Sequence, residues 1–253
     1  MENNSNSMIS DEFFTTKTIK NVAVLEFQKF PLKRIVYIPE KEKIFTYLRL
    51  LEKDKNIKIL LVLNSPHKMV KENYINFIKT VTKNDLDLTK ISCLYNAINQ
   101  IILKIINFNK IIIHVDDGVI IPPFMNISLA CDYRIVGDST VFRNPNIELD
   151  LPPKGGGIYF LSKIMGHSKT FEFLMSGKDM TAKEAKDLGL INEIVSSKNL
   201  RQEALNIAQE FAKKPVHFLS GIKKLLNWNF NEIKTYLEYE NNLLINYIRD
   251  GRN

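Results

Sequence analysis

The apolar residues of this chain come in short runs, and the length of these runs limits the folds that the chain can adopt. The runs at Ile111–Ile113 and Val119–Ile121 have the length of β-strands. No uncharged apolar stretch reaches the roughly 18–20 residues that a transmembrane helix requires. We therefore expect a chain without membrane-spanning segments and without a membrane partner.

Strand-like and helical segments alternate until about residue 200. Ile57–Leu63 and Lys110–Val115 have the pattern of buried strands, and Ile91–Phe108 has the apolar spacing of a long helix. Helical patterns dominate the rest of the chain, which predicts an α/β core followed by a helical region. The expected parts are a flexible tail at residues 1–14, the core at 15–199 and C-terminal helices for oligomerisation at 200–253.

The charge of the chain is strongly positive. It carries 35 basic and 28 acidic residues, a formal net charge of +7. Such a charge suits an anionic partner, such as nucleic acid, a membrane surface or a phosphate-bearing ligand. It also suits lysine-rich codon usage, and the dispersal of the lysines without a basic block favours this second explanation. We therefore expect no nucleic-acid partner.

Cysteine usage and the polar N-terminus indicate the compartment. Cys93 and Cys131 are the only cysteines among 253 residues, which is typical of a reduced protein rather than of a disulfide-stabilised one. The first residues lack an apolar targeting region, so we expect a cytoplasmic protein. No set of His, Cys, Asp or Glu has the spacing of metal ligands, so we expect no metal site.

Four short motifs between residues 110 and 195 carry a family resemblance. They are SLACDYRI at 128–135, VFRNP at 141–145, PKGGG at 153–157 and GLINEIV at 189–195. Their sequences and order resemble those of the crotonase (enoyl-CoA hydratase/isomerase) superfamily. The resemblance implies an α/β core built as a spiral of repeated ββα units, and a C-terminal helical region that forms homotrimers or dimers of trimers. It also implies a coenzyme A thioester as the ligand, with no further cofactor.

The same resemblance implies a shortened C-terminal region. Members of the superfamily often end with one more helix, which covers the active site in many of them. The present sequence stops at Asn253, about where that helix would begin. We therefore expect a more open pocket or a different packing of the C-terminal helices.

Amides stand at the positions of the family's two catalytic glutamates. Asn126 occupies the position of the first glutamate and Asn146 that of the second. An amide does not titrate near neutral pH, so neither residue can act as a general acid or base. Either side chain could bind a thioester carbonyl or hold a water molecule, and the alternative is that both are vestigial.

The backbone donors that hold the thioester oxygen in the family are changed as well. Pro122, Pro123 and Phe124 stand where the family has three glycines. Proline has no N–H, so Pro123 cannot donate the hydrogen bond that the middle glycine gives in the family. Loss of one such donor typically costs about 10²–10³ in rate. The backbone N–H of Asn73 is the best match for the second donor.

Three further residues are candidates for substitute chemistry. Glu148 and Asp150 alternate with apolar residues in an expected extended segment, which places them on the same face as Asn146. Either could therefore supply a displaced carboxylate. The alternative is a solvent-facing edge. Lys154 precedes Gly155 and Gly156 at an expected helix N-terminus, which favours anions such as a phosphate, a carboxylate or an acyl group. The alternative is a solvated loop lysine.

Joint loss of both carboxylates and one donor predicts a binding or scaffolding member of the superfamily. Such a protein would keep an acyl-CoA pocket without the usual acid–base pair, and would assemble with itself or with an active paralogue. The alternative is an active acyl-CoA hydratase, isomerase, decarboxylase or hydrolase with relocated catalytic groups. A carboxylate from elsewhere within hydrogen-bonding reach of Asn126 and Asn146 would favour this alternative.

Overall fold

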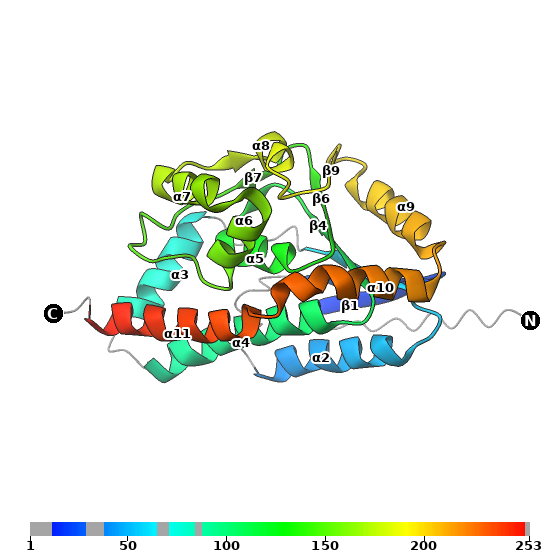
Figure 1. The fold of residues 1–253 in the computed structure, drawn as a ribbon, viewed down its shortest axis with the longest axis horizontal. Coiled ribbons are helices and arrows are strands. Elements are labelled where there is room, and N and C mark those ends of the chain that lie inside the picture. The colour runs from blue at the N-terminus through cyan, green and yellow to red at the C-terminus, as the bar shows by residue number, and fades with distance from the viewer. Residues whose placement is uncertain (1–11, 29–37, 65–70, 84–87, 251–253) are drawn as a thin grey trace, which may run out of the picture.

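The computed structural model describes residues 12–28, 38–64, 71–83 and 88–250. These residues form a mixed α/β fold, with helices on both faces of a sheet (Figure 1). Most of the expected N-terminal tail lies outside the described residues. Phe13 and Phe14 are buried, however, and Phe14 begins the first strand. The boundary predicted at residue 15 therefore comes too late.

The main sheet has six strands in the order β1-β2-β3-β4-β6-β9. β1 runs antiparallel to β2, and the other neighbouring strands are parallel. The six strands are β1 (Phe14–Ile19), β2 (Val22–Phe27), β3 (Ile59–Leu63), β4 (Ile111–Asp116), β6 (Tyr133–Gly137) and β9 (Glu193–Val195). A smaller sheet is formed by β5 (Val119–Ile120), β7 (Val141–Phe142) and β8 (Met180–Thr181). The strands predicted around 57–63 and 110–115 are confirmed as β3 and β4.

Helices connect and cover these strands. Within the described residues, the helices begin with α2 (Ile38–Lys53), α3 (Lys71–Lys83), α4 (Leu88–Asn107), α5 (Pro122–Leu129) and α6 (Gly157–Met165). They are followed by α7 (His167–Ser176), α8 (Ala182–Asp187), α9 (Leu200–Ala212), α10 (Val216–Asn227), the short 3-10 helix η1 (Trp228–Phe230) and α11 (Ile233–Asp250). The long helix predicted at 91–108 is confirmed as α4. No helix within the described ranges is long and apolar enough to cross a lipid bilayer.

The central strands are buried on both faces, which explains their continuous apolar sequences. Successive side chains of a strand point to opposite faces. Leu60 of β3 and Ile112 of β4 face the larger core, which includes α2, α4 and α5. Leu61 and Ile113 face the other side and pack with Ala204 of α9, which is fully buried. The sheet therefore lies between α9 and the larger group of helices.

The C-terminal helices fold back onto the core rather than extending from it. In Figure 1, α11 lies along α4 across one side of the molecule. The buried residues of α11 that join the larger core are Ile233, Leu237, Leu244 and Ile248. This packing brings α11 to the part of the molecule that holds the candidate site.

Candidate functional site

A small cavity lies where α3, α4, α5 and the segment leading into α6 meet. Its volume is about 30 Å³, more than the roughly 10–15 Å³ that is needed to hold one water molecule. We call it the central cavity. Its lining residues are Tyr74, Ile78, Leu94, Tyr95, Ile98, Pro123, Asn146, Leu149, Leu151, Pro152 and Lys154. As lined by the described residues, it is far smaller than an ordinary ligand site.

Asn126 lies beside this cavity but does not line it. The side chain is 1% exposed, and its Nδ2 donates a hydrogen bond of 2.8 Å to the backbone oxygen of Lys154. A Cβ atom added to Gly157 would lie only 2.7 Å from the same Nδ2. The amide therefore ties α5 to the start of α6, and a glycine is needed for the two to approach so closely.

Asn146 does line the central cavity. Its Nδ2 donates to Oδ1 of Asn144 over 2.9 Å, and Asn144 donates in turn to the backbone oxygen of Phe173 over 2.7 Å. These bonds connect the cavity wall to α7. The structure thus places the two predicted amides in one region, with only Asn146 facing the cavity.

The first turn of α5 offers no free backbone donor at the predicted position. Pro122 and Pro123 open the helix, and Ile121 precedes it. The N–H of Phe124, the next residue, already donates to the oxygen of Ile121 over 3.1 Å. The Phe124 side chain faces away into a second, apolar cavity of about 70 Å³, which Ile127 of the same helix also lines.

The second predicted donor, Asn73, is in the first turn of α3. Its side chain is exposed and does not line the central cavity, whereas the next residue, Tyr74, does. The residues before this helix, 65–70, lie outside the described ranges.

Of the three charged residues that the sequence offers as substitutes, only Lys154 lies at the central cavity. It is 8% exposed and lines the central cavity, so it is not a solvated loop lysine. Its Nζ donates to Oε2 of Glu240 and to Oδ1 of Asn99, both over 2.6 Å. Burial lowers the pKa of Lys154, and the charge of Glu240 partly offsets this effect.

Glu240 of α11 occupies the anion-binding position predicted at the start of α6. The N–H of Gly155 donates to Oε2 of Glu240 over 2.8 Å, and the N–H of Gly156 donates to Oε1 over 3.0 Å. With Lys154, three donors hold this carboxylate, which is 5% exposed. The helix N-terminus therefore binds an anion, as predicted, and the anion belongs to the chain itself.

A chain of amides extends this polar cluster between α4 and α11. Asn99 donates to the backbone oxygen of Leu237 over 3.2 Å and to Oδ1 of Asn241 over 3.1 Å. Asn241 donates to Oδ1 of Asn96 over 2.9 Å. The buried charges are thus surrounded by hydrogen-bonding partners, as a stable buried ion pair requires.

Sequence reasoning missed Glu240, although a signal was present. Glu240 falls between Leu237 and Leu244 on the face of α11 that carries buried apolar residues. A charged residue on such a face needs a buried partner. The pattern could have marked Glu240 as paired, without identifying Lys154 as its partner.

Glu148 and Asp150 do not lie where the sequence predicted. Residues 146–150 form consecutive turns rather than an extended segment. The N–H of Leu149 donates to the oxygen of Pro145, and the N–H of Asp150 donates to that of Ile147. The period-2 alternation therefore does not apply, and both carboxylates are exposed. Neither lines the central cavity, but Asp150 and Asn146 both line a larger groove on the outer side of these turns. The prediction of an extended segment is therefore wrong.

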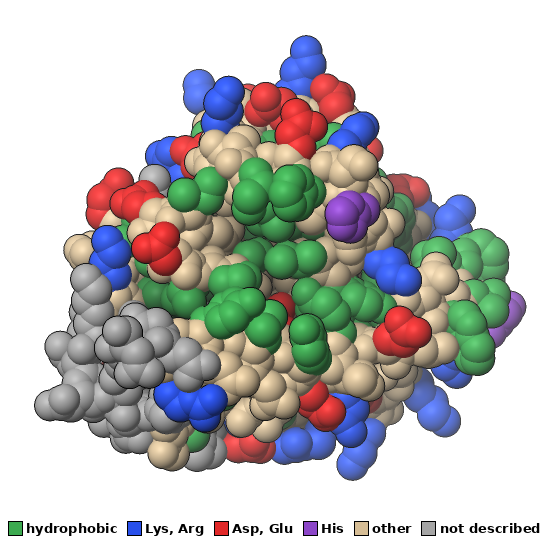
Figure 2. Space-filling model, turned by 60° about the vertical axis from the view of Figure 1, so that its left-hand side comes forward, with side chains coloured by type: hydrophobic (Ala, Val, Ile, Leu, Met, Phe, Trp, Pro, Cys, Tyr) green, Lys and Arg blue, Asp and Glu red, His purple; other side chains and the backbone are tan. Residues whose placement is uncertain are grey.

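These turns separate the central cavity from an outer groove of about 550 Å³. Asn146, Leu151 and Pro152 line both spaces. The far wall of the groove comes from α7 and includes the exposed apolar residues Phe171 and Met175. Figure 2 shows hydrophobic side chains gathered around a hollow on this side of the molecule. Within the described residues, no group of three or more His, Cys, Asp and Glu is arranged to hold a metal ion.

Comparisons with known proteins identify the family. The family model described as "Enoyl-CoA hydratase/isomerase" matches residues 78–251. A crystal structure of enoyl-CoA hydratase from Bacillus halodurans superposes with a TM-score of 0.75 at 19% sequence identity, covering 93% of this chain and 95% of that one. This likeness shows that the fold is the crotonase fold.

Two curated relatives illustrate the sequence similarity. Trans-2-decenoyl-[acyl-carrier-protein] isomerase of Streptococcus mutans is 23% identical over 222 residues, 87% of this chain and 82% of that protein. The alpha subunit of the fatty acid oxidation complex of Shewanella loihica is 36% identical over 107 residues, 40% of this chain but only 15% of that protein. Through the match of the family model and the shared fold, the chain belongs to the enoyl-CoA hydratase/isomerase family.

Proposed function

We propose that this protein binds an acyl-CoA thioester at the central cavity and lacks the usual hydratase and isomerase chemistry. The observation that carries the proposal is the bond from Asn126 to the backbone of Lys154, because it occupies the side chain at a position where the family has a catalytic acid or base. The prolines that open α5 and the occupied N–H of Phe124 support it further, because they leave no free backbone donor at residues 122–124 for a thioester oxygen.

A thioester would need more space than the central cavity offers. The wall formed by Asn146, Leu151 and Pro152 separates about 30 Å³ from the 550 Å³ of the outer groove. Outward movement of the turns at 146–150 would join the two spaces into one of ordinary ligand-site size. We place the ligand on this route, with Asn146 as the first polar contact for its carbonyl.

A direct test uses crotonyl-CoA and coenzyme A with the full chain. We expect saturable binding by calorimetry and no hydration above the uncatalysed rate. Asn146→Leu should weaken binding about tenfold because it removes the polar lining group, whereas Asn206→Leu on exposed α9 should not. Absence of binding at millimolar ligand would exclude the pocket, and turnover above background would exclude the non-catalytic role.

Lys154 carries the second candidate function, that of an active acyl-CoA lyase or isomerase with a relocated proton donor. It lines the cavity, its pKa is lowered by burial, and Tyr95 lies beside it, with the Nζ 5.4 Å from the ring centre. Glu148 lines neither space, and Asp150 lines only the outer groove. If turnover is found, Lys154→Met should abolish it.

The proposal includes self-association through α10, as a trimer or a dimer of trimers in the cytoplasm, or association with an active paralogue. An exposed apolar row follows one face of this helix at helical spacing, consisting of Phe218, Ile222, Leu225 and Leu226. Such a row on a soluble domain marks a contact surface.

Sedimentation tests this surface. Leu225 is 78% exposed, so Leu225→Asp should leave the fold intact and shift the protein to monomers. Phe171→Asp on α7 changes an equally apolar exposed position outside the row and should keep the assembly. The opposite pattern would place the contact on α7, and a monomeric unmodified chain would refute self-association.

A further inference from the structure

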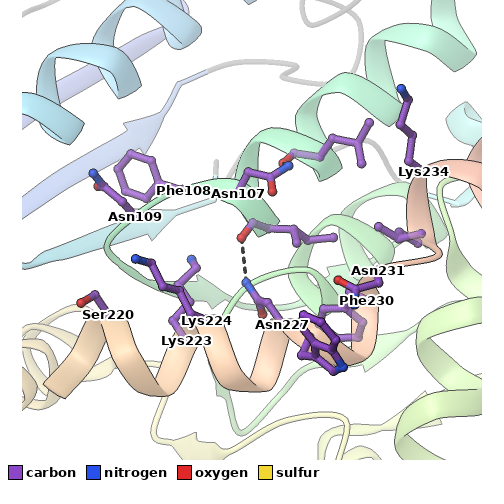
Figure 3. A pocket seen from close by; sticks show the side chains of 14 residues that line it. Asn107, Phe108, Asn109, Ser220, Lys223, Lys224, Asn227, Phe230, Asn231 and Lys234 are labelled. Atoms are coloured by element: carbon purple, nitrogen blue, oxygen red, sulfur yellow. Dashed lines mark hydrogen bonds between the residues drawn. The ribbon is translucent and has the colours of Figure 1, made fainter. Parts of the chain in front are cut away.

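A second large groove shares no lining residue with the central cavity. It has a volume of about 520 Å³ and runs between the last turn of α4, one face of α10, and the start of α11 (Figure 3). Phe108 and Asn109 of its wall lead directly into the amino end of β4. The central cavity, in contrast, includes Pro123, which comes after the carboxyl end of the same strand.

The helix α10 turns a polar face to this groove. Ser220, Lys223, Lys224 and Asn227 line it, and their spacing places them on one side of the helix. The exposed apolar row of α10 lies on a different face, so a subunit contact there leaves the groove open. The remaining wall is supplied mostly by α4 and by residues 228–234.

The charge of the groove is positive and lacks an internal counterion. None of its 14 lining residues is acidic. Lys223 is neutralised by Asp132, with Nζ 2.7 Å from Oδ2. Lys224 and Lys234 have no ion-pair partner among the described residues, and Figure 3 shows them toward opposite ends of the groove. A ligand with distributed negative charge would satisfy both.

The amides of the groove present acceptors. Asn107, Asn109 and Asn227 each donate through Nδ2 to a backbone oxygen, at 2.8, 3.3 and 2.7 Å respectively. These bonds fix the side chains, and no donor from the described residues contacts their Oδ1 atoms. These Oδ1 atoms can therefore accept hydrogen bonds from hydroxyl or amino groups of a ligand.

An aromatic surface completes the lining. Trp228 is 74% exposed at one edge, and Phe230 contributes a partly buried ring to the wall, whereas Phe108 is 1% exposed and lies behind this surface. A flat ring system gains from stacking on such side chains. We propose that the groove binds a nucleoside phosphate, since this ligand combines a planar base, sugar hydroxyls and an amino group, and negative charge for the two lysines. The groove is also of the size that such ligands need.

Trp228 is the only tryptophan of the chain, so intrinsic tryptophan fluorescence comes from the edge of this groove. Titration of the full chain with ATP should change this fluorescence in a saturable manner. Adenosine and tripolyphosphate should each bind at least about tenfold more weakly than ATP. Adenosine lacks the phosphates that would pair with the lysines, and tripolyphosphate lacks the base that would stack on the aromatic side chains. Calorimetry on the same samples provides a second readout that does not depend on the ring.

Charge reversal supplies the matched variants. Lys224→Glu combined with Lys234→Glu should weaken ATP binding at least about tenfold, whereas Lys183→Glu on exposed α8 should leave it unchanged. No saturable signal, equal affinity for tripolyphosphate and ATP, or unchanged binding by the double variant would each overturn the proposal. Loss of self-association in the double variant, with no ATP binding by the unmodified chain, would instead assign the groove to a second copy. A CoA titration of the double variant tests the central cavity separately.

Discussion

Replacing Glu240 with alanine should lower the free energy of unfolding by about 3–5 kcal/mol, the usual effect of breaking a buried ion pair from one side. The substitution leaves the ammonium of Lys154 buried without a counterion, and leaves the N–H groups of Gly155 and Gly156 without an acceptor. Urea denaturation followed by circular dichroism measures this loss.

Two variants separate the ion pair from the loss of side-chain volume. Glu238→Ala removes an exposed carboxylate from the same helix and should change the unfolding free energy by less than about 0.5 kcal/mol. Glu240→Leu combined with Lys154→Met replaces both charges with apolar groups and should recover much of the loss. A loss below about 1 kcal/mol for Glu240→Ala would show that the pair is not needed for stability.

The loss of unfolding free energy in Glu240→Ala should also depend on pH. Burial already lowers the pKa of Lys154, and removal of Glu240 takes away the charge that opposes this effect. Between the folded pKa and the unfolded value of about 10.4, the unfolded state binds more protons, so stability rises with pH. Glu240→Ala should therefore be least stable, relative to the unmodified chain, below the folded pKa of Lys154, and should recover part of the difference above it.

Asn126→Glu, which introduces the family's residue, should destabilise the protein without creating activity. The longer side chain has no room, because a Cβ on Gly157 would already lie 2.7 Å from Nδ2 of Asn126. A carboxylate also cannot donate to the backbone oxygen of Lys154. Overpacking and an unsatisfied carbonyl together should cost about 3 kcal/mol or more, and hydration of crotonyl-CoA should stay at background because Pro123 provides no N–H.

Asn146→Glu is the matched control for added charge. Asn146 is only partly buried, so this change should cost less than about 1 kcal/mol.

Asn126→Asp keeps the size of the side chain and removes the Nδ2 donor, so it isolates the hydrogen bond to Lys154. Its penalty should fade as pH drops through the raised pKa of a buried carboxyl, because the protonated acid can donate again. Hydratase activity in Asn126→Glu would contradict the assignment of this residue to a structural bond.

The parts of the fold that the sequence predicts are those set by local chemistry. Gly156 and Gly189 adopt positive φ angles of 69° and 77°, which glycine tolerates and most residues do not. Such positions mark the start of α6 and the end of α8 regardless of what packs on them. The buried strands β3 and β4 are equally visible, because their apolar runs suit burial on both faces.

The parts that sequence reasoning predicted wrongly depend on distant contacts or on ambiguous patterns. A five-residue alternation cannot distinguish a strand from consecutive turns, so the sequence predicts an extended segment at Ile147–Leu151, where the structure has turns. The anion at the start of α6 comes from Glu240, 86 residues after Lys154. The local motif predicts that an anion binds there, but only the tertiary packing of α11 on α4 identifies it.

This separation along the chain also has a consequence for the order in which the molecule assembles during synthesis. Translation produces Lys154 and the glycines that follow long before it produces Glu240. Until α11 has been made and has docked, the Lys154 ammonium has no Glu240 carboxylate to neutralise it in the partly folded chain. The N–H groups of Gly155 and Gly156 also lack their acceptor. Docking of α11 closes a long loop, a step that is entropically slow. Maturation of the site is therefore expected to follow the synthesis of Lys154 only after a delay, and the incomplete intermediate is the species most in need of chaperone protection.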